Sequence, residues 1–294
     1  MVTAHSTADA IVGHAATAFT TADLRPVFST ELGLLFDIDA TDMLRAIADA
    51  SVDLVFADPP FNLKKDYGEK APDDRPDDAY VRWCFEWVDE CVRILKPGGS
   101  LFLFNLPKWS IRIGAHLMQD FGAELDFRHD IAIEMKNRMP IPGRLYPAHY
   151  SLLYFTKGKA ARFGRVRTPL VRCRHCGELA CDYGGHASKM KAEGANLTDV
   201  WCDIPIVRHR RYSNAARGAN ALSTKILERV LAIGSAPGDL VVDPFGGSGT
   251  TYHVAERLGR RWIGTDTEFA HAIETRLRTG LPVPHPNTDH VSAD

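Results

Sequence analysis

The four residues Asp58-Pro59-Pro60-Phe61 follow a short apolar run and combine side chains that can hold an amine. Proline fixes φ and has no N–H, so this turn should be stiff, and an ionised Asp58 carboxylate and the Pro59 carbonyl can only accept hydrogen bonds. An amino group has two N–H donors for these acceptors, and its lone pair can then be aimed at an electrophilic methyl group. Phe61 would stack against the ring that carries the amine. The alternative is a structural turn with Phe61 in the core.

A glycine-rich turn after the apolar run 240–242 is a second candidate site. Glycines let the backbone turn sharply and approach a ligand, and the helix predicted from Thr250 offers unpaired N–H groups at its N-terminus. Asp266 follows Asp243 by 23 residues and ends the next predicted strand, where an acidic side chain meets ribose hydroxyls in nucleotide-binding βαβ units. The residues predicted to contact a nucleotide-like ligand are Asp243, Phe245, Gly246, Gly247, Ser248, Gly249, Thr250 and Asp266.

Two phosphate-binding patterns do not fit this turn. No Lys-Ser or Lys-Thr pair follows the glycines, as a P-loop requires, and the spacing departs from the dinucleotide pattern G-x-G-x-x-G. The remaining alternative is a tight connection between a strand and a helix, and the second acidic residue at Asp266 argues against it.

A cluster of cysteines has the spacing of a metal site. Four soft or borderline ligands lie within 14 residues, namely Cys173, Cys176, Cys181 and His186. Tetrahedral structural zinc would suit this set, with Cys202 or His175 as substitutes for one ligand. The alternative is a group of unligated thiols. Catalytic zinc is not expected, because transfer of a methyl group needs no activated water.

The charge of the chain is uneven along its length. The formal net charge is -2, but segment 156–217 holds 13 basic and five acidic residues, which leaves the rest of the chain at -10. A basic block of this kind suits a protein that docks a polyanion on one surface. The alternative is a solvated basic insertion without a partner.

Length and composition are those of an ordinary globular protein. The chain has 294 residues, 45% of them hydrophobic, which suits one large domain with an insertion or two small ones. No run of about 18 apolar residues is present, and the N-terminus lacks a basic stretch before its apolar part, so we expect a cytoplasmic protein without a membrane partner. Cysteines in that compartment are seldom paired, and we expect Cys84 and Cys91 in the core.

Apolar runs and helical spacings alternate along the chain. The first part predicts strands at 34–38, 52–57, 100–104, 131–134 and 151–155, and helices at 41–50, from a cap at Asp77 to a stop at 96–99, and at 108–120. The second part predicts a helix from Thr224, a strand at 240–243, a helix at 250–258, a strand at 261–265 and a final helix. This order indicates a doubly wound, mostly parallel α/β sheet with an inserted basic, Cys-rich subdomain. Both candidate turns would then lie at the carboxyl edge of the sheet.

The two turns together resemble the catalytic and cofactor signatures of the DNA amino-methyltransferases. The catalytic motif comes first, then a variable region, then the cofactor turn, an order that resembles the β class of that family. Segment 36–40 is similar to the family's lead-in, with Asp39 at the position of a usual cofactor contact. Further matches are 51–54, 96–99, 199–201 and the helix after Lys225, so the resemblance covers about 34–277 apart from the insertion.

The resemblance implies a Rossmann-like methyltransferase fold, S-adenosylmethionine as cofactor and double-stranded DNA as substrate, with transfer to an extruded base. Asp at the first motif position favours adenine N6, whereas Ser there usually goes with cytosine N4, which stays the runner-up. Two departures are Phe61, where the family commonly has Tyr, and segment 220–226, which forms part of the cofactor-pocket wall. Cytosine C5 methylation is excluded, because it needs a cysteine nucleophile next to proline and no Pro-Cys pair occurs.

The predicted domain limits are 1–28 for a flexible N-terminal tail, 29–280 for the methyltransferase catalytic domain and 281–294 for a C-terminal tail. The insertion 156–217 is expected to recognise the target sequence, with the zinc loop at 173–186. The resemblance also implies a homodimer and a cognate restriction endonuclease as partners. The alternatives are a non-catalytic DNA-binding accessory subunit, and methylation of RNA or protein, which the motif order disfavours.

Overall fold

The computed structural model describes residues 18–19, 24–64, 73–135, 142–143, 145–170, 172, 176–178, 194–205 and 222–279. The strands of the main sheet are β1 (Phe28–Ser29), β2 (Gly33–Phe36), β3 (Val52–Ala57), β4 (Leu95–Asn105), β5 (Leu125–Glu134), β6 (His149–Lys157), β9 (Val200–Trp201), β10 (Leu240–Asp243) and β11 (Arg261–Thr265). A separate ribbon consists of β7 (Arg167–Thr168) and β8 (Ala195–Asn196). The helices are α2 (Ala40–Ala46), α3 (Asp77–Ile94), α4 (Pro107–Asp120), α5 (Thr224–Gly234), α6 (Thr250–Arg257) and α7 (Ala270–Thr279).

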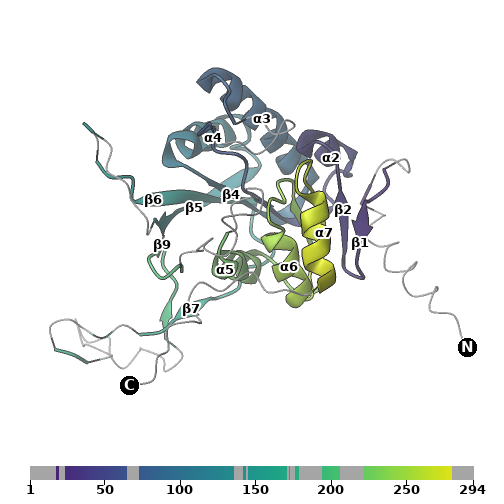
Figure 1. Ribbon diagram of the computed structural model, residues 1–294. Coiled ribbons are helices and arrows are strands. Elements are labelled where there is room, and N and C mark those ends of the chain that lie inside the picture. The colour runs from purple at the N-terminus through teal and green to yellow at the C-terminus, as the bar shows by residue number, and fades with distance from the viewer. Residues whose placement is uncertain are drawn as a thin grey trace, which may run out of the picture.

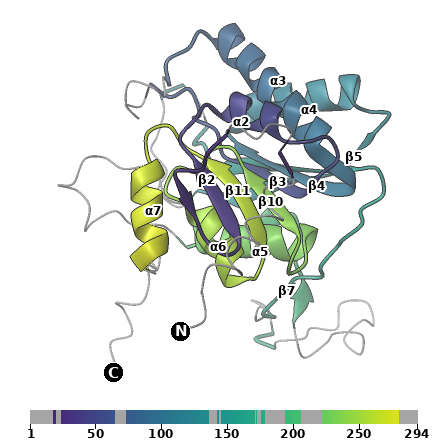
Figure 2. The same cartoon turned by 90° about the vertical axis from the view of Figure 1, so that its right-hand side faces the viewer.

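The main sheet is mixed and has helices on both faces. Within the described residues its strand order is β1-β2-β11-β10-β3-β4-β6-β5-β9, and the five strands from β2 to β4 run parallel. Helices α2, α3 and α4 pack on one face, and α5, α6 and α7 pack on the other (Figures 1 and 2). The prediction of a doubly wound, mostly parallel sheet is therefore confirmed. No described helix combines the length and apolarity that a membrane span requires.

The central strands are buried on both faces, as parallel strands covered by two helix layers must be. All residues of β10 are buried, and in β3 only Asp53 is not. Cys84 and Cys91 belong to α3 and are fully buried, which confirms that they are core residues. Because the thiol of Cys84 is buried, its pKa is raised to about 12.

The carboxyl ends of the parallel strands lie together at one edge of the sheet. Val55 of β3 pairs with Val242 of β10, and Asp243 of β10 pairs with Gly264 of β11. Asp58 and Asp266 therefore follow the ends of the two strands that flank β10. Strand β6 runs antiparallel to β4, so it begins at this same edge.

Two helix ends differ from the sequence predictions. Helix α2 ends at Ala46 rather than at residue 50, because Ile47 is extended, fully buried and bridged to Phe19. The prediction that Asp77 caps α3 is wrong: Pro76 takes the N-cap position, and Asp77 is the first helical residue. The Asp77 carboxylate instead accepts a hydrogen bond from Lys108 Nζ at 2.6 Å.

Strand β4 begins earlier than predicted. It starts at Leu95, directly after α3, so segment 96–99 ends the helix but lies inside the strand. The register between β3 and β4 shifts at this point, between Val52 and Leu54. Gly98 has φ +81°, a conformation that favours glycine and that lets the strand absorb the irregularity.

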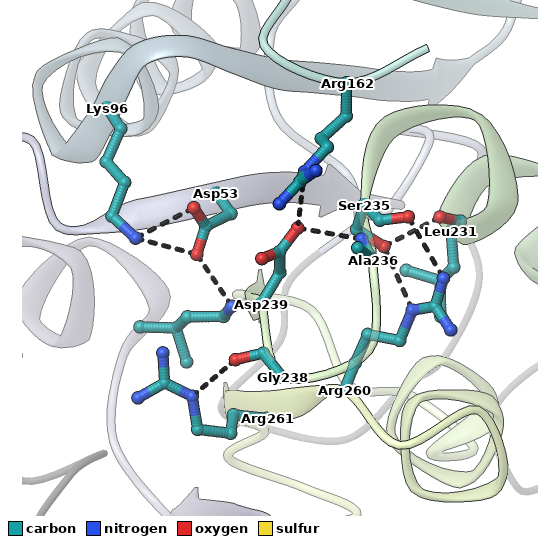
Figure 3. Close-up of polar contacts among 11 residues, drawn as sticks. Asp53, Lys96, Arg162, Leu231, Ser235, Ala236, Gly238, Asp239, Arg260 and Arg261 are labelled. Atoms are coloured by element: carbon teal, nitrogen blue, oxygen red, sulfur yellow. Dashed lines mark hydrogen bonds and ion pairs between the residues drawn. The ribbon is translucent and has the colours of Figure 1, made fainter. Parts of the chain in front are cut away.

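The opposite edge of the sheet, where the parallel strands begin, carries a network of polar contacts (Figure 3). Lys96 Nζ donates to both carboxylate oxygens of Asp53 at 2.8 Å, and Asp53 Oδ2 also accepts from the backbone N of Leu240 at 2.9 Å. Arg162, near the start of segment 156–217, pairs with Asp239 at 3.8 Å. The network joins β3, β4 and β10 and holds the beginning of the basic segment on the core.

A later part of the basic segment, around Asp203, is also tied to the core. Asp203 accepts hydrogen bonds from Arg229 at 2.6 and 2.8 Å and from Lys225 at 2.7 Å. Burial acts to raise the pKa of Asp203, but the hydrogen bonds and charges of these two cations lower it to about 2. Arg162 and Asp203 thus tie two described parts of the insertion to the core, while its domain limits stay predictions.

Candidate active site

The predicted tetrapeptide begins where β3 ends and is held by the two helices that follow it in sequence. Tyr80 Oη of α3 donates to the Pro60 carbonyl at 2.6 Å, and Trp109 Nε1 of α4 donates to the Phe61 carbonyl at 2.8 Å. Pro59 is buried, and Asp58 is partly exposed. Helices α3 and α4 therefore hold the backbone of the turn, while Asp58 stays partly exposed to solvent.

A second brace lies just after the tetrapeptide. The buried carboxylate of Asp73 accepts from the backbone N of Asn62 at 2.5 Å and of Leu63 at 3.0 Å. The Asn62 side chain exchanges two hydrogen bonds with the backbone of Arg75, both at 2.7 Å. These contacts stabilise Asn62 at φ +57°, in the left-handed region that only Gly, Asn and Asp adopt readily.

Three aromatic rings gather beside Asp58. The ring of Phe61 lies 5.9 Å from both Phe104 and Tyr150, and these two lie 5.0 Å apart. Burial and then the negative charge of Asp58 raise the pKa of Tyr150. Phe61 is only partly buried against the core, which leaves part of its ring for stacking.

The glycine-rich turn is closed by its own backbone. Asp243 Oδ1 accepts from the backbone N of Phe245 at 2.9 Å, and the backbone N of Gly246 donates to the Thr265 carbonyl at 2.9 Å. Gly249 caps α6 with φ +73°. A Cβ on Gly246 would lie 2.6 Å from Tyr252 Oη and 3.0 Å from the Thr265 carbonyl oxygen, so the turn requires glycine there.

The rest of the predicted cofactor residues line the same edge. Asp266 Oδ2 accepts from the backbone N of Gly247 at 2.7 Å, and its Oδ1 accepts from Glu268 and Phe269 at 2.9 and 2.7 Å. Burial raises the pKa of Asp266, and these backbone donors oppose the rise. Asp39 is exposed and caps α2 through Oδ1, with Thr41 N at 2.8 Å.

The sites of Asp39 and Asp266 are adjacent in space. Strands β2 and β11 pair through Phe36 and Thr265, and Thr265 Oγ1 donates to the Ile38 carbonyl at 2.6 Å. Ser248 and Thr250 face one another through their hydroxyls at 3.0 Å. An ionised carboxylate can accept about four hydrogen bonds, so Asp39 and Asp266 both keep acceptor capacity for hydroxyl or ammonium groups of a ligand.

Helix α3 contacts both candidate turns, a link that the sequence did not predict. The ring of Phe245 in the glycine-rich turn lies 5.7 Å from Trp83 and 5.0 Å from Trp87, while Tyr80 of the same helix holds Pro60. Tyr80 and Trp83 are themselves in contact at 5.6 Å. The spacing of Tyr80, Trp83 and Trp87 puts them on one helix face, which is the signal that could have found them.

Asp243 is 2% exposed, and its carboxylate accepts a hydrogen bond within the turn instead of facing solvent. Burial raises its pKa to about 7, although hydrogen bonds from Thr251 and from the Phe245 backbone lower it. Because the folded pKa exceeds the ordinary value of 3.8, this group lowers stability as the pH rises from 3.8 through about 7. Its assignment as a direct cofactor contact stays a prediction.

The substitution Asp243→Asn should remove this pH dependence. The amide keeps an oxygen for Phe245 N–H but has no charge to bury. The stability of the variant relative to wild type should therefore increase from pH 5 to pH 8. Between the two pH values, we expect the unfolding free energy of the variant relative to that of wild type to rise by at least about 1 kcal/mol. A pKa shift of one unit corresponds to about 1.4 kcal/mol. Urea unfolding of both proteins at the two pH values measures it. Parallel stability profiles would contradict a buried titrating Asp243.

Most of the predicted zinc ligands lie outside the described residues. This applies to Cys173, Cys181 and His186, whereas Cys176 is described and exposed. Among the residues that the structure describes, no three His, Cys, Asp or Glu side chains gather as metal ligands do. The described parts of segment 156–217 are mostly irregular, with the short strands β7, β8 and β9, and these described residues do not form a Cys-rich subdomain.

The chain is similar to known DNA methylases in sequence. A family model described as N6_N4_Mtase, DNA methylase, matches residues 52–274. The Type II methyltransferase M.BamHI of Bacillus amyloliquefaciens is 46% identical over 257 residues, which are 87% of this chain but 59% of M.BamHI. The Type II methyltransferase M.HpaI of Haemophilus parainfluenzae is 32% identical over 246 residues, covering 81% of this chain and 72% of M.HpaI.

Solved structures share the fold. PvuII DNA methyltransferase (cytosine-N4-specific) has a TM-score of 0.60 at 19% identity, covering 90% of this chain and 97% of that chain. M1.HpyAVI, in a complex with SAM, has a TM-score of 0.56 at 18% identity and covers 84% of this chain and 99% of that chain. The sheet order, the paired turns and the family match agree, and the chain belongs to the N6_N4_Mtase family of DNA methylases.

Proposed function

We propose that this chain transfers a methyl group from S-adenosylmethionine to an exocyclic amine of a base in double-stranded DNA. The observation that carries the proposal is the meeting of the two turns. The tetrapeptide and the glycine-rich turn follow neighbouring parallel strands, β3 and β10, and α3 contacts both of them. An amine bound at Asp58 would therefore lie beside a ligand bound over Gly246.

The acceptors of the tetrapeptide fit an amino group. The Asp58 carboxylate and the Pro59 carbonyl would accept its two N–H bonds and aim the nitrogen lone pair at the methyl carbon. The N–C bond forms as the S–C bond breaks, sulfur keeps the bonding electron pair, and the surplus amine proton passes to Asp58 or solvent. Tyr80 and Trp109 hold the turn in place, so positioning supplies much of the catalysis.

The target base must leave the duplex to reach Asp58. The partly exposed ring of Phe61, with Tyr150 and Phe104 behind it, offers the extruded base a stacking surface. Stacking on an aromatic face does not distinguish one base from another. The choice of base therefore depends on groups that meet its edge, and Asp58 is one of them.

The chemistry of the donor set fits S-adenosylmethionine. The carboxylates of Asp39 and Asp266 would accept ribose and ammonium hydrogens, and the half-buried ring of Phe245 packs against α3 at the same edge. A sulfonium is also stabilised by the negative charge at this edge. The structural neighbour M1.HpyAVI, which was solved with SAM, supports this choice.

Adenine N6 is the proposed target, supported by the resemblance of Asp58-Pro59-Pro60-Phe61 to adenine-directed motifs. Cytosine N4 is the second candidate, because the structural neighbour PvuII is described as cytosine-N4-specific. Sequencing that maps modified bases in DNA from expressing cells would give base and site together. N6-methyladenine at one recurring sequence supports the first candidate, N4-methylcytosine supports the second, and unmodified DNA contradicts both.

The partners of the whole protein are proposals of the same kind. The curated relatives are named Type II methyltransferases, which supports pairing with a cognate restriction endonuclease. The basic segment 156–217, anchored through Arg162 and Asp203, is the proposed DNA-recognition region. We also propose a cytoplasmic location and a homodimer, both of which rest on the family resemblance.

The zinc site stays a prediction that rests on ligand spacing alone. Plasma emission analysis of protein purified without chelator should find about one equivalent of zinc if Cys173, Cys176, Cys181 and His186 bind it. The variant Cys176→Ser should lose that equivalent. A zinc content well below one equivalent in the wild-type protein would contradict the prediction.

The variant Tyr80→Phe tests whether α3 positions the catalytic turn. It removes the donor to Pro60 and the acceptor for Asn105 Nδ2 at 3.1 Å, so unfolding should cost about 1–3 kcal/mol less. We expect kcat for DNA methylation to fall about tenfold, while the cofactor Kd stays unchanged. Tyr154→Phe, which removes an equally buried hydroxyl from the middle of β6, is the matched control. Equal kcat in the two variants would contradict a positioning role.

A further inference from the structure

Two exposed apolar side chains lie a few residues before β6, the strand that begins at the catalytic edge of the sheet. Strand β6 starts at this edge, where Ser151 pairs with Asn105 at the end of β4, and Tyr150 contacts the ring of Phe61. The residues just before β6 continue outward from the edge, since Met135 N still donates to the Ala148 carbonyl at 2.9 Å. The chain ahead of β6 therefore lies beside the proposed base-binding surface.

Leu145 is 94% exposed and Tyr146 is 56% exposed. Single exposed apolar residues are ordinary on protein surfaces, but two in succession beside a site are not explained by chance exposure. Pro147 restricts Tyr146 to an extended backbone, so less conformational entropy is lost when this segment binds a partner. In Figure 1 the chain that leads into β6 stands outside the layered core.

We propose that Leu145 and Tyr146 form an apolar wedge that enters the DNA stack and fills the gap left by the extruded target base. This inference rests on the proposed function. Extrusion costs unstacking and unpairing energy, and apolar side chains that insert between base steps recover part of the lost contact. Leu, in particular, is a side chain that minor-groove binding proteins use in this way.

The distance along the chain suits this role. Tyr146 precedes Tyr150 by four residues, which span at most about 14 Å when fully extended. Tyr150 belongs to the surface that would receive the base. The surface that would bind the extruded base and the gap that this base leaves in the duplex are about one nucleotide apart. A short extended segment before Tyr150 can therefore reach the gap while Tyr150 contacts the base.

The occupant follows from the neighbouring groups. A second copy of this chain or another protein would also cover apolar residues. The wedge, however, directly precedes the strand of Tyr150, whose ring contacts Phe61 and whose phenol is affected by the charge of Asp58, and these groups must face the nucleic acid if the site works on DNA. Leu63, which follows the tetrapeptide closely, is also exposed at this edge, whereas the exposed Met118 of α4 is distant from it. Met118 lies eleven residues into α4, which starts at the edge and runs away from it for about 16 Å.

The test compares two DNA duplexes that carry the mapped recognition site. One is fully paired, and in the other the partner of the target base is replaced by an abasic nucleotide, so that extrusion is already easy. The double variant L145A/Y146A should lose about tenfold in kcat/KM on the paired duplex and less than about twofold on the abasic duplex. The conservative variant L145M/Y146F and the surface control Met118→Ala should match wild type on both.

A second readout is independent of the chemistry. With 2-aminopurine at the target position of the paired duplex, wild type should raise the fluorescence as the base leaves the stack, and L145A/Y146A should give a much smaller rise. An equal loss of kcat/KM on both duplexes, or wild-type values on the paired duplex, would overturn the wedge. Failure of wild type to methylate either duplex would instead overturn the proposed function, so the two failures are distinguishable.

Discussion

Replacement of Asp58 by alanine should abolish methyl transfer to DNA and leave cofactor binding nearly intact. The carboxylate would be one of the two acceptors that hold the amine, and its negative charge helps to raise the pKa of Tyr150. Removal of a single preorganised hydrogen-bonding group from an active site typically lowers kcat by about 10²–10³-fold. The cofactor residues Asp39 and Asp266 follow other strands, so the Kd for S-adenosylmethionine should stay within about twofold of wild type.

The measurement is transfer of labelled methyl groups to DNA under single-turnover conditions, with cofactor affinity from calorimetry. Asp58→Asn is the matched control, because its amide keeps one acceptor oxygen and the same shape but loses the charge. We expect Asp58→Asn to lie between wild type and Asp58→Ala. Turnover of Asp58→Ala equal to wild type would remove this residue from the catalytic site.

Replacement of Asp266 by alanine should act on cofactor affinity instead of the chemical step. Hydrogen bonds to charged groups contribute about 1.5–3 kcal/mol, so the Kd for S-adenosylmethionine should rise about 10- to 100-fold. At saturating cofactor, kcat should recover to within a fewfold of wild type. The melting temperature should also fall, because the backbone N–H groups of Gly247, Glu268 and Phe269 lose their acceptor.

The control for this variant removes one negative charge from the same edge without touching the turn. Asp42 of α2 is exposed and makes only a surface ion pair with Arg45 at 3.6 Å, so Asp42→Ala should leave the Kd unchanged. Calorimetry should measure the Kd of both variants for S-adenosylmethionine at a temperature well below their melting temperatures. A Kd of Asp266→Ala equal to that of Asp42→Ala would exclude Asp266 from the cofactor pocket.

The sequence predicted those parts of the fold that local signals define. Strands β3, β10 and β11 have the predicted limits, because each is a short apolar run closed by a polar turn. The two candidate turns could be placed at one edge because carboxyl ends of parallel strands meet there. The order of the two turns along the chain indicated a resemblance to the DNA amino-methyltransferases, and the family match confirms it.

Contacts between distant segments were beyond sequence reasoning. Tyr80 lies 20 residues from Pro60, and Trp109 lies 48 residues from Phe61, so no local spacing relates these pairs. Segment 96–99 has the sequence of a helix terminator followed by a turn, yet pairing with β3 extends β4 back to Leu95. Helix packing decides such features, and it depends on the assembled core rather than on any one window of sequence.

The central claim is that Asp58 and the glycine-rich turn form one site for methyl transfer to a DNA amine. The most direct test incubates the purified wild-type protein with DNA and S-adenosylmethionine that carries a deuterated methyl group, then analyses the nucleosides by mass spectrometry. We predict deuterated N6-methyladenine, or deuterated N4-methylcytosine if cytosine is the target, and neither with Asp58→Ala. No labelled nucleoside from a DNA-binding wild type, or label in 5-methylcytosine, would contradict the account.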